Sequence, residues 1–415
     1  MARRAERVRR PPRALTGRGV AALLSGGGLL VAANVTAVPA LLALGVLLIA
    51  LVVIAAIVVH APRSGAGVGR AVAADLLSVG AESAVALRLD LRTVLPPSPG
   101  VWSDALPAAV DGDAGGPFPP EDRRRGPDGT TMTLRYRIRG RRRGLWALGP
   151  VSVTTGDPFG LVRRTREFGE VTPITVVPEV VVLPALPDRA GRAGGTAQTS
   201  ASRLGQGADN MSPRRYVPGD SMRRIHWRAT AHRGDLMVRQ EEQESSPDAL
   251  VVLDRAGARW PGRGRRGDSA DPAFERAVSA CASIALHLAE HGYAVDVVDA
   301  TGVLLGRLRG AEDEREALLV VLAAVSPRSG EHDEGLPAAA NGHLVGPLVM
   351  ITGAIDPAEA ATLPHGGAAT PILLATESPP AALSAAASRG WRAGALDDDI
   401  AGSWGDAGGA ADAGR

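Results

Sequence analysis

An uncharged apolar run from Gly19 to Val59 limits the folds open to this chain more than any other feature. A single helix of that length would reach about 60 Å, roughly twice the hydrocarbon thickness of a bilayer. We therefore predict two membrane-spanning helices, Gly19–Val35 and Pro39–Val59. A cleaved signal peptide has a much shorter apolar segment. The glycines at 26–28 weaken the first helix, which leaves a single span as the alternative.

Positive charge flanks this run on both sides. Residues 1–18 carry seven arginines against a single acid, and His60, Arg63 and Arg70 follow the run. By the positive-inside rule, this distribution places both ends in the cytoplasm. We expect a multi-pass protein of the cell membrane, with a basic cytoplasmic N-terminus, a transmembrane hairpin over 19–59 and soluble domains that face the cytoplasm.

Length, charge and cysteine content narrow the class of protein further. A chain of 415 residues is too long for one typical core and predicts two or three folded units. The net charge of +2 is small, so the chain as a whole lacks the basic footprint of a dedicated nucleic-acid binder. Cys281 is the only cysteine, which excludes an intramolecular disulfide and fits a reducing compartment.

Residues 64–185 are predicted to form a β-rich, sandwich-like domain. Apolar and polar residues alternate over Val85–Leu91 and again over Met132–Ile138, which is the period of half-buried strands. Two more strands fit Pro150–Thr154 and Thr172–Val177. Short alternating strands without a helical period favour a small β-sandwich.

The same domain contains a Pro- and Gly-rich stretch and several arginine clusters. We expect Pro96–Gly129 to be a long loop, partly disordered. The clusters Arg123–Arg125, Arg141–Arg143 and Arg163–Arg164 have two interpretations. They form a solvated strand face, or they contact anionic lipid headgroups beneath the bilayer.

The sequence of the second half of the chain predicts a linker, an α/β unit and a tail. Residues 186–207 are Gly-, Ala- and Ser-rich and predict a flexible linker. Strands and helices alternate over 208–395, which indicates a mostly parallel sheet covered on both faces. Residues 396–415 are acidic and Gly-rich and predict a disordered tail. The expected strands are Ala249–Leu253, Tyr293–Asp299, Val303–Leu308, Leu348–Thr352 and Pro371–Ala375, and the expected helices are Pro272–His291, Asp313–Val325 and Pro380–Ser388.

Charged, aromatic and turn residues crowd together in one stretch, Arg215–Gln240. Asp220 is a candidate N-cap for a short helix and Gly234 a candidate C′ residue, with a strand expected over Leu236–Arg239. This stretch has more hydrogen-bonding capacity than a short helix needs to fold. Its candidate partner-binding residues are Asp220, Arg223, Arg224, His226, Trp227, Arg228 and Arg239.

The run PGDSMRRIHWRATAHRGDLMVR within this stretch resembles the signature of a bacterial family, domain of unknown function 58. Members of that family are similar to this chain in plan, with a membrane hairpin, a β-rich segment that ends near a DPFG-like turn (here Asp157–Gly160), the signature and an α/β unit. The resemblance implies a von Willebrand factor A-like version of the parallel sheet. It also implies a partner class, the MoxR-type AAA ATPases. The activity of the family is not established.

Two sequence motifs resemble metal-binding motifs, but neither fits a metal site well. In A-like domains an Asp-x-Ser-x-Ser loop after the first strand holds a cation, but the loop Asp254–Ala258 keeps only the aspartate, and hard cations need several oxygen ligands. His287–His291 spells H-x-x-E-H, an inverted zinc-protease motif. On a helix, however, Glu290 would point away from the apolar stripe. We expect neither a metal nor a cofactor, and no phosphate-binding loop is present.

The sequence as a whole predicts a membrane-tethered interaction protein rather than an enzyme, because it contains no recognisable nucleophile. Arginine and tryptophan are enriched in binding hot spots, so the Arg/Trp-rich stretch is the expected contact for a protein partner such as a MoxR-type AAA ATPase. One alternative is a hydrolase that uses His226 or His232. The other is binding of anionic lipid or nucleic acid through the arginine clusters.

Overall fold

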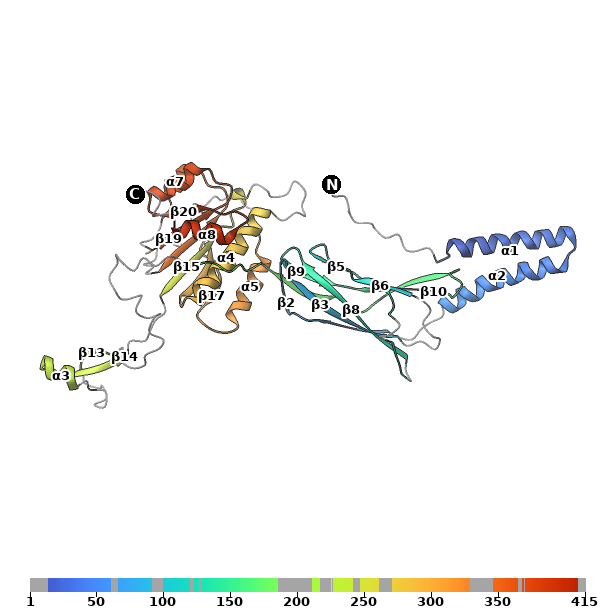
Figure 1. Ribbon diagram of the computed structural model, residues 1–415, viewed down its shortest axis with the longest axis horizontal. Helices are drawn as coiled ribbons and strands as arrows, with labels where there is room; N and C mark the ends of the chain where they lie inside the picture. The colour runs from blue at the N-terminus through green and yellow to red at the C-terminus, as the bar shows by residue number, and fades with distance from the viewer. Residues whose placement is uncertain are drawn as a thin grey trace. The chain divides into compact units, whose positions relative to one another are not determined.

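The computed structural model divides the chain into two compact units, Met1–Glu179 and Val180–Arg415 (Figure 1). The residues that the structure describes are 14–60, 66–91, 100–119, 123–126, 129–185, 211–216, 225, 227–241, 247–260, 271–328, 346–364, 368 and 370–409.

The first unit opens with two apolar helices, α1 (Gly17–Thr36) and α2 (Pro39–His60), close to the two predicted spans (Figure 1). Both are long and apolar enough to cross a membrane, and only 17% and 22% of their apolar windows are buried. Gly26 and Gly45 face each other, since a Cβ on either would lie within 3.1 Å of the other's carbonyl oxygen. Gly26, one of the three glycines that weaken the first helix, therefore lets the two helices approach closely together with Gly45.

The rest of the first unit is built from three small sheets. The first has the order β1-β3-β8-β5, with β7 also paired to β8, the second β11-β10-β4-β6 and the third β2-β12-β9. All neighbours are antiparallel except β2 and β12. The strands are β1 (Ala66–Val72), β2 (Leu76–Ser78), β3 (Glu82–Leu91), β4 (Gly100–Asp104), β5 (Val110–Gly112), β6 (Gly115–Pro117), β7 (Arg123–Gly126), β8 (Gly129–Gly140), β9 (Gly144–Leu148), β10 (Val151–Gly156), β11 (Arg163–Phe168) and β12 (Thr172–Val177).

One apolar core joins these three sheets. The predicted alternation places one face of β3 and β8 inside it, where Leu87 pairs directly with Leu134. Trp102 of β4, Val153 of β10 and Val176 of β12 complete the same core from the other two sheets. The strand-rich domain expected from the alternating pattern is therefore confirmed.

The single long loop expected over Pro96–Gly129 is wrong, because four short strands, β4 to β7, lie within it. These strands have three to five residues, and each contains glycine. Their local sequence gives little strand signal. β5 and β7 pair with the long strand β8, β4 pairs with β10, and β6 pairs with β4, so tertiary pairing overrides local propensity.

The second unit contains a six-stranded sheet with the order β17-β16-β15-β18-β19-β20 (Figure 1). Every pair is parallel except β16 and β17. The mostly parallel sheet was predicted from the alternation of strands and helices. The strands are β15 (Asp248–Leu253), β16 (Ala294–Asp299), β17 (Leu304–Leu308), β18 (Pro347–Thr352), β19 (Thr370–Ala375) and β20 (Arg392–Ala395).

Helices pack against this sheet, namely α4 (Pro272–Glu290), α5 (Glu314–Ala324), α6 (Pro357–Ala360), α7 (Pro380–Ser388) and α8 (Ile400–Gly409). Asp271 caps α4 as predicted, with its carboxylate accepting from the Ala273 amide at 2.9 Å. The face that carries Val252 and Met350 shares an apolar cluster with α6 and α7. Alternate residues point to the opposite face. There α4 contacts β15 and β16, and α8 contacts β19 and β20.

Helix α8 contradicts the disordered tail expected over 396–415, at least as far as Gly409. Trp404 is fully buried and donates its Nε1–H to the carbonyl of Pro184 at 3.0 Å. Val181 likewise donates its amide to Ser283 of α4. Burial of one indole thus orders a Gly-rich sequence of poor helix propensity.

A small hairpin carries the Arg/Trp-rich stretch. It pairs β13 (Met211–Arg215) with β14 (Met237–Glu241), and α3 (Trp227–Arg233) lies between them in sequence. Gly234 ends the helix with φ of +76°, as predicted for its C′ residue. The predicted cap, Asp220, lies outside the described residues.

Candidate functional site

The carboxyl ends of β15 and β18 are the place where this kind of sheet most often binds a ligand. These two strands are neighbours in the sheet. The chain leaves β15 toward β16 on one side and leaves β18 toward β19 on the other. In open α/β sheets, the crevice at such a switch in strand order is the usual ligand site.

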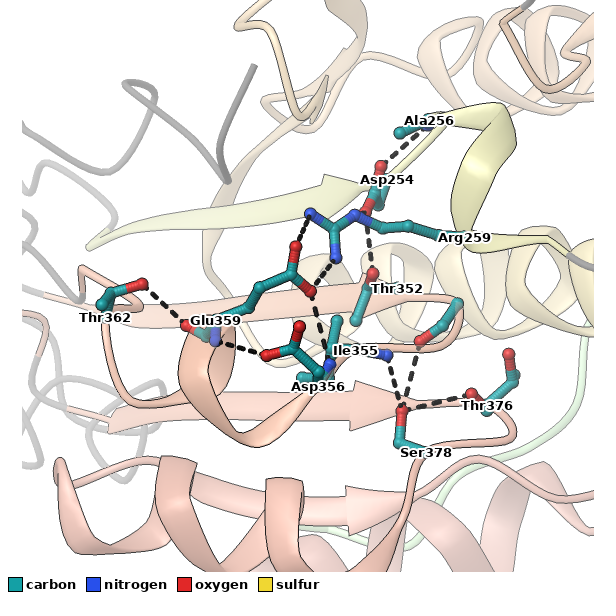
Figure 2. Close-up of polar contacts among 11 residues, drawn as sticks. Asp254, Ala256, Arg259, Thr352, Ile355, Asp356, Glu359, Thr362, Thr376 and Ser378 are labelled. Carbon is teal, nitrogen blue, oxygen red and sulfur yellow. Dashed lines mark hydrogen bonds and ion pairs between the residues drawn. The ribbon is translucent and has the colours of Figure 1, made fainter. Parts of the chain in front are cut away.

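Two polar side chains stand at these strand ends, one from each strand (Figure 2). Asp254 follows β15 and is fully buried, and Thr352 ends β18 and is fully buried as well. The Thr352 hydroxyl donates to Oδ2 of Asp254 at 2.7 Å, and the Ala256 amide donates to Oδ1 at 2.8 Å. The aspartate that the sequence identified is thus held between the two strands.

Arg259 closes the same crevice from a short 3₁₀ turn, Gly257–Arg259 (Figure 2). Its Nε lies 3.0 Å from Oδ2 of Asp254, and its side chain is only 6% exposed. The Ala354 amide donates to the Arg259 carbonyl at 2.9 Å. A Cβ at Gly353 would collide with that carbonyl, so glycine is needed for the turn to lie this close to the strand end.

Glu359 of α6 binds the other side of the Arg259 guanidinium. The contact is bidentate, with Nη1 to Oε2 at 2.8 Å and Nη2 to Oε1 at 3.2 Å. A capping box fixes α6, because Asp356 accepts from the Glu359 amide at 2.8 Å and Glu359 accepts from the Asp356 amide. The Ser378 hydroxyl accepts from the Ile355 amide just before this helix. Two segments, the end of β15 and helix α6, therefore meet at one guanidinium.

This geometry has a clear chemical consequence. Both oxygens of Asp254 accept from protein donors, and the positive charge beside it is a guanidinium. Arg259 supplies the charge that a bound cation would supply in an A-like loop, but it has no exchangeable ligand positions. The sequence shows that the Asp254–Ala258 loop lacks the two serines of the Asp-x-Ser-x-Ser motif. It does not indicate that Arg259 fills the crevice.

A second ion cluster lies at the end of β16. Asp299 is buried and pairs with Arg328 at 2.6 Å and with Arg255 at 3.5 Å. The Arg328 guanidinium also donates to Thr301 at 2.7 Å. Burial first, and then the charge of Arg328, lower the pKa of Arg255 from its ordinary value. Through Arg328, this cluster connects the segment that follows α5 to the edge of the sheet at which the parallel strands end.

The H-x-x-E-H motif does not assemble into a zinc-protease site. Glu290 is exposed and pairs with Arg315 of α5 at 3.3 Å. The His291 ring Nδ1 lies 2.7 Å from the His287 carbonyl, and the two rings stack at 4.2 Å. The His287 ring also contacts Trp404 edge to face. Burial, followed by the nearby His291, lowers the pKa of His287. Among the residues that the structure describes, no group of three His, Cys, Asp or Glu side chains could hold a metal.

The predicted partner-binding residues are only partly described. Asp220, Arg223, Arg224 and His226 lie outside the described residues. The backbone of Arg228 lies in α3 and that of Arg239 in β14. The Trp227 side chain, at the start of α3, is 69% exposed, and His232 on the same helix is exposed too.

Comparison with known proteins identifies part of the second unit. Residues 212–344 match the family described as "Protein of unknown function DUF58". These residues are similar to that family, and we refer to residues 212–344 as the DUF58 region. The resemblance noted in the signature stretch is thereby confirmed, and the DUF58 region contains α3, β14 to β17, α4 and α5.

A curated relative agrees with this assignment. The uncharacterized protein YeaD of Bacillus subtilis is 26% identical over 162 residues, which are 39% of this chain and 37% of that protein. Two solved structures also align, each over about a quarter of this chain. They are the CARDB domain of a Pyrococcus furiosus protein in complex with di-metal ions and a cohesin module of a Clostridium perfringens family 33 glycoside hydrolase. Their sequence identities are 11% and 10%, with TM-scores of 0.17 and 0.16, covering 27% and 28% of this chain and 88% and 98% of those chains. Likenesses this weak establish nothing about the fold.

Proposed function

We propose that this chain is a membrane-tethered interaction protein whose α/β unit binds a protein partner. In this proposal α1 and α2 both cross the cell membrane and the soluble units face the cytoplasm. Basic residues flank both ends of the apolar run, and basic flanks favour the cytoplasmic side. The partner class is a MoxR-type AAA ATPase, which the family resemblance implies.

The observation that carries the proposal is the exposure of Trp227. Its side chain is 69% exposed on a short helix in the Arg/Trp-rich stretch of the DUF58 region. A hydrogen bond from the Met237 amide to the Thr230 hydroxyl holds this helix to the hairpin, and the Tyr216 amide donates to the Leu236 carbonyl beside it. Tryptophan and arginine are the residues most enriched in binding hot spots.

We further propose that the α/β unit is von Willebrand factor A-like. The strand order supports this, since it corresponds to 3-2-1-4-5-6 in chain order with one antiparallel edge strand, β17. The crevice at the end of β15 is closed by Arg259 and its two acidic partners. In our proposal the unit therefore acts through its surface, without a bound metal and without catalysis.

The test is a direct binding measurement with a purified MoxR-type ATPase from the same organism. We expect the wild type to bind and the triple variant Arg223→Ala/Arg224→Ala/Trp227→Ala to lose most of the affinity. A control removes two exposed arginines and one exposed apolar residue elsewhere, Val303→Ala/Arg309→Ala/Arg315→Ala, and should bind normally. Equal binding by the two triple variants would overturn the proposed contact.

The rival functions predict different outcomes. If the chain is a hydrolase, His226→Ala or His232→Ala would abolish activity while the partner stays bound. If the arginine clusters bind nucleic acid, affinity would fall steeply with salt in proportion to the phosphates neutralised. If the triple variant binds the partner normally and one of these two results is obtained, the corresponding rival function replaces our proposal.

A further inference from the structure

The turn between β10 and β11, Asp157–Gly160, attaches the strand-rich domain to the start of α1. Thr16, the N-cap of α1, donates its amide to the Leu161 carbonyl at 2.9 Å and its hydroxyl to the Gly160 carbonyl at 2.6 Å. Arg163 donates its amide to the carbonyl of Ala14. The chain before α1 is therefore paired to the segment that follows the turn.

The same segment also holds the end of α2. Arg164 donates from Nη1 to the carbonyl of His60, the last residue of that helix, at 2.9 Å. Leu161 and Val162 are buried in one apolar cluster with residues from the last turns of α2, including Ala55 and Val59. Both helices thus meet the turn at the ends where they would leave a membrane.

Close contact at this joint depends on a glycine. A Cβ at Gly19, in the first turn of α1, would collide with the carbonyl oxygen of Leu161. The helix can lie against the turn only because this position has no side chain. The distance between the turn and the helix end is therefore fixed by backbone contacts.

Asp157 makes the turn itself rigid. Its carboxylate is buried and accepts from two amides, Phe159 at 2.9 Å and Val162 at 2.6 Å. The two oxygens of this acid are thus turned inward. The next two residues, Pro158 and Phe159, project outward, and Phe159 is 59% exposed.

Phe159 lies beside the two helix ends that would leave the membrane. Side chains such as Trp, Phe and Leu bury their apolar groups at the boundary between headgroups and acyl chains. Two exposed arginines flank the turn: Arg18, in the first turn of α1, and Arg163, at the start of β11. Their charge complements anionic headgroups.

We propose that the Asp157–Gly160 turn is a lipid contact, in which Phe159 sits in the headgroup layer and Arg18 and Arg163 bind anionic lipid headgroups. The proposal rests on the membrane assignment of α1 and α2 made above. It adds a second attachment to the bilayer, one that fixes the strand-rich domain against the membrane surface.

Site-directed fluorescence can test this contact, because the chain has a single, fully buried cysteine. Burial raises the pKa of the Cys281 thiol to about 12, so it labels poorly, and Cys281→Ala removes it altogether. In that background, Phe159→Cys carries an environment-sensitive fluorophore. The full-length protein is reconstituted into phosphatidylcholine vesicles, with or without phosphatidylglycerol, that contain lipids spin-labelled near the headgroup or near the chain end.

Two matched positions serve as controls. Val171 is 56% exposed, close to the value for Phe159, but it follows the far end of β11, about 17 Å along that strand. Leu47 is 62% exposed in the middle of α2. We expect quenching of Phe159→Cys by headgroup-level labels, quenching of Leu47→Cys by deep labels and neither for Val171→Cys.

The outcomes separate this proposal from the membrane assignment. If Leu47→Cys is quenched and Phe159→Cys behaves like Val171→Cys, the lipid contact is wrong and the membrane hairpin stands. If none of the three is quenched, the membrane assignment fails and the contact fails with it. Phosphatidylglycerol should strengthen quenching at Phe159→Cys, and Arg18→Ala/Arg163→Ala should abolish that increase. Equal quenching in both vesicle types would overturn the role of the arginines.

Discussion

Arg259 and Asp254 form an ion pair in which the two side chains are only 6% and 1% exposed. The pair lies at the switch in strand order, where an α/β sheet ordinarily leaves room for a ligand. Because Glu359 binds the opposite side of the guanidinium, Arg259 carries its charge between two carboxylates. The Arg259 side chain thus fills the crevice, and we expect its interactions with Asp254 and Glu359 to stabilise the second unit.

Arg259→Met should destabilise the second unit strongly. The substitution keeps the apolar stem but leaves the buried Asp254 carboxylate without its counter-charge, a change that costs about 3–5 kcal/mol in buried pairs. The free energy of unfolding of the full-length protein, measured in urea and detergent, checks this. Arg309→Met is the control, since Arg309 pairs with Asp296 near the surface and should cost about 1 kcal/mol or less. Equal effects of the two substitutions would contradict the role given to Arg259.

Tyr136→Phe should weaken the strand-rich domain by about 1.5–3 kcal/mol, the usual value of a hydrogen bond to a charged group. The Tyr136 hydroxyl donates to Asp104 at 2.5 Å, and the same carboxylate pairs with Arg70, both side chains being almost fully buried. Burial, followed by the hydrogen bond to Asp104, raises the pKa of Tyr136 above its ordinary value of 10.

The raised pKa sets the pH dependence of this interaction. The folded state holds the phenol proton more tightly than the unfolded state, so the stabilisation is complete below pH 10 and is lost as pH rises beyond it. Unfolding measured between pH 8 and pH 11 should show a decline in the wild type that is smaller in Tyr136→Phe. Parallel pH profiles for the two proteins would show that Tyr136 does not titrate as described.

Much of the fold could be predicted where the sequence carries a regular period. The alternation over Val85–Leu91 gave β3, and the Asp271-Pro272 pair gave the start of α4 to the residue. Strands β4 to β7 were missed because they are short and depend on pairing with strands distant in the sequence or with each other. Helix α8 was missed because its sequence has poor propensity, whereas Trp404 bonds to Pro184, 220 positions away, and Ile400 and Ala407 are buried with it.

The site was predictable to a lesser degree. Asp254 was found because it follows an apolar strand, and the missing hydroxyls near it were plain in the sequence. The contact between Arg259 and Glu359 could not be predicted from the sequence, because Glu359 lies 100 positions further along the chain and no local pattern connects the two residues. Binding by the Arg/Trp-rich stretch stays a prediction, because most of its named side chains lie outside the described residues.

His287→Gln should reduce the acid sensitivity of the second unit. The buried His287 ring has a lowered pKa, so the unfolded state binds a proton near pH 6.5 more readily than the folded state does. Its contribution to stability is therefore present above pH 6.5 and is lost as pH falls below that value. Unfolding of wild type and His287→Gln is compared at pH 7.5 and pH 5, with the exposed His232→Gln as control. A pH effect that is unchanged by His287→Gln would assign the acid sensitivity to other groups.

Trp404→Ala should detach α8 from the sheet and destabilise the second unit by about 3–5 kcal/mol, the usual range for a buried tryptophan. The indole is fully buried, bonds to the Pro184 carbonyl and contacts the His287 ring. We therefore expect protease cleavage near residues 396–400 in the variant but not in the wild type, together with lower stability in urea. Trp227→Ala, at a 69% exposed tryptophan, is the matched control and should change neither. If Trp404→Ala left both measurements unchanged, α8 would not be packed as described, and the disordered tail expected from its composition would be restored.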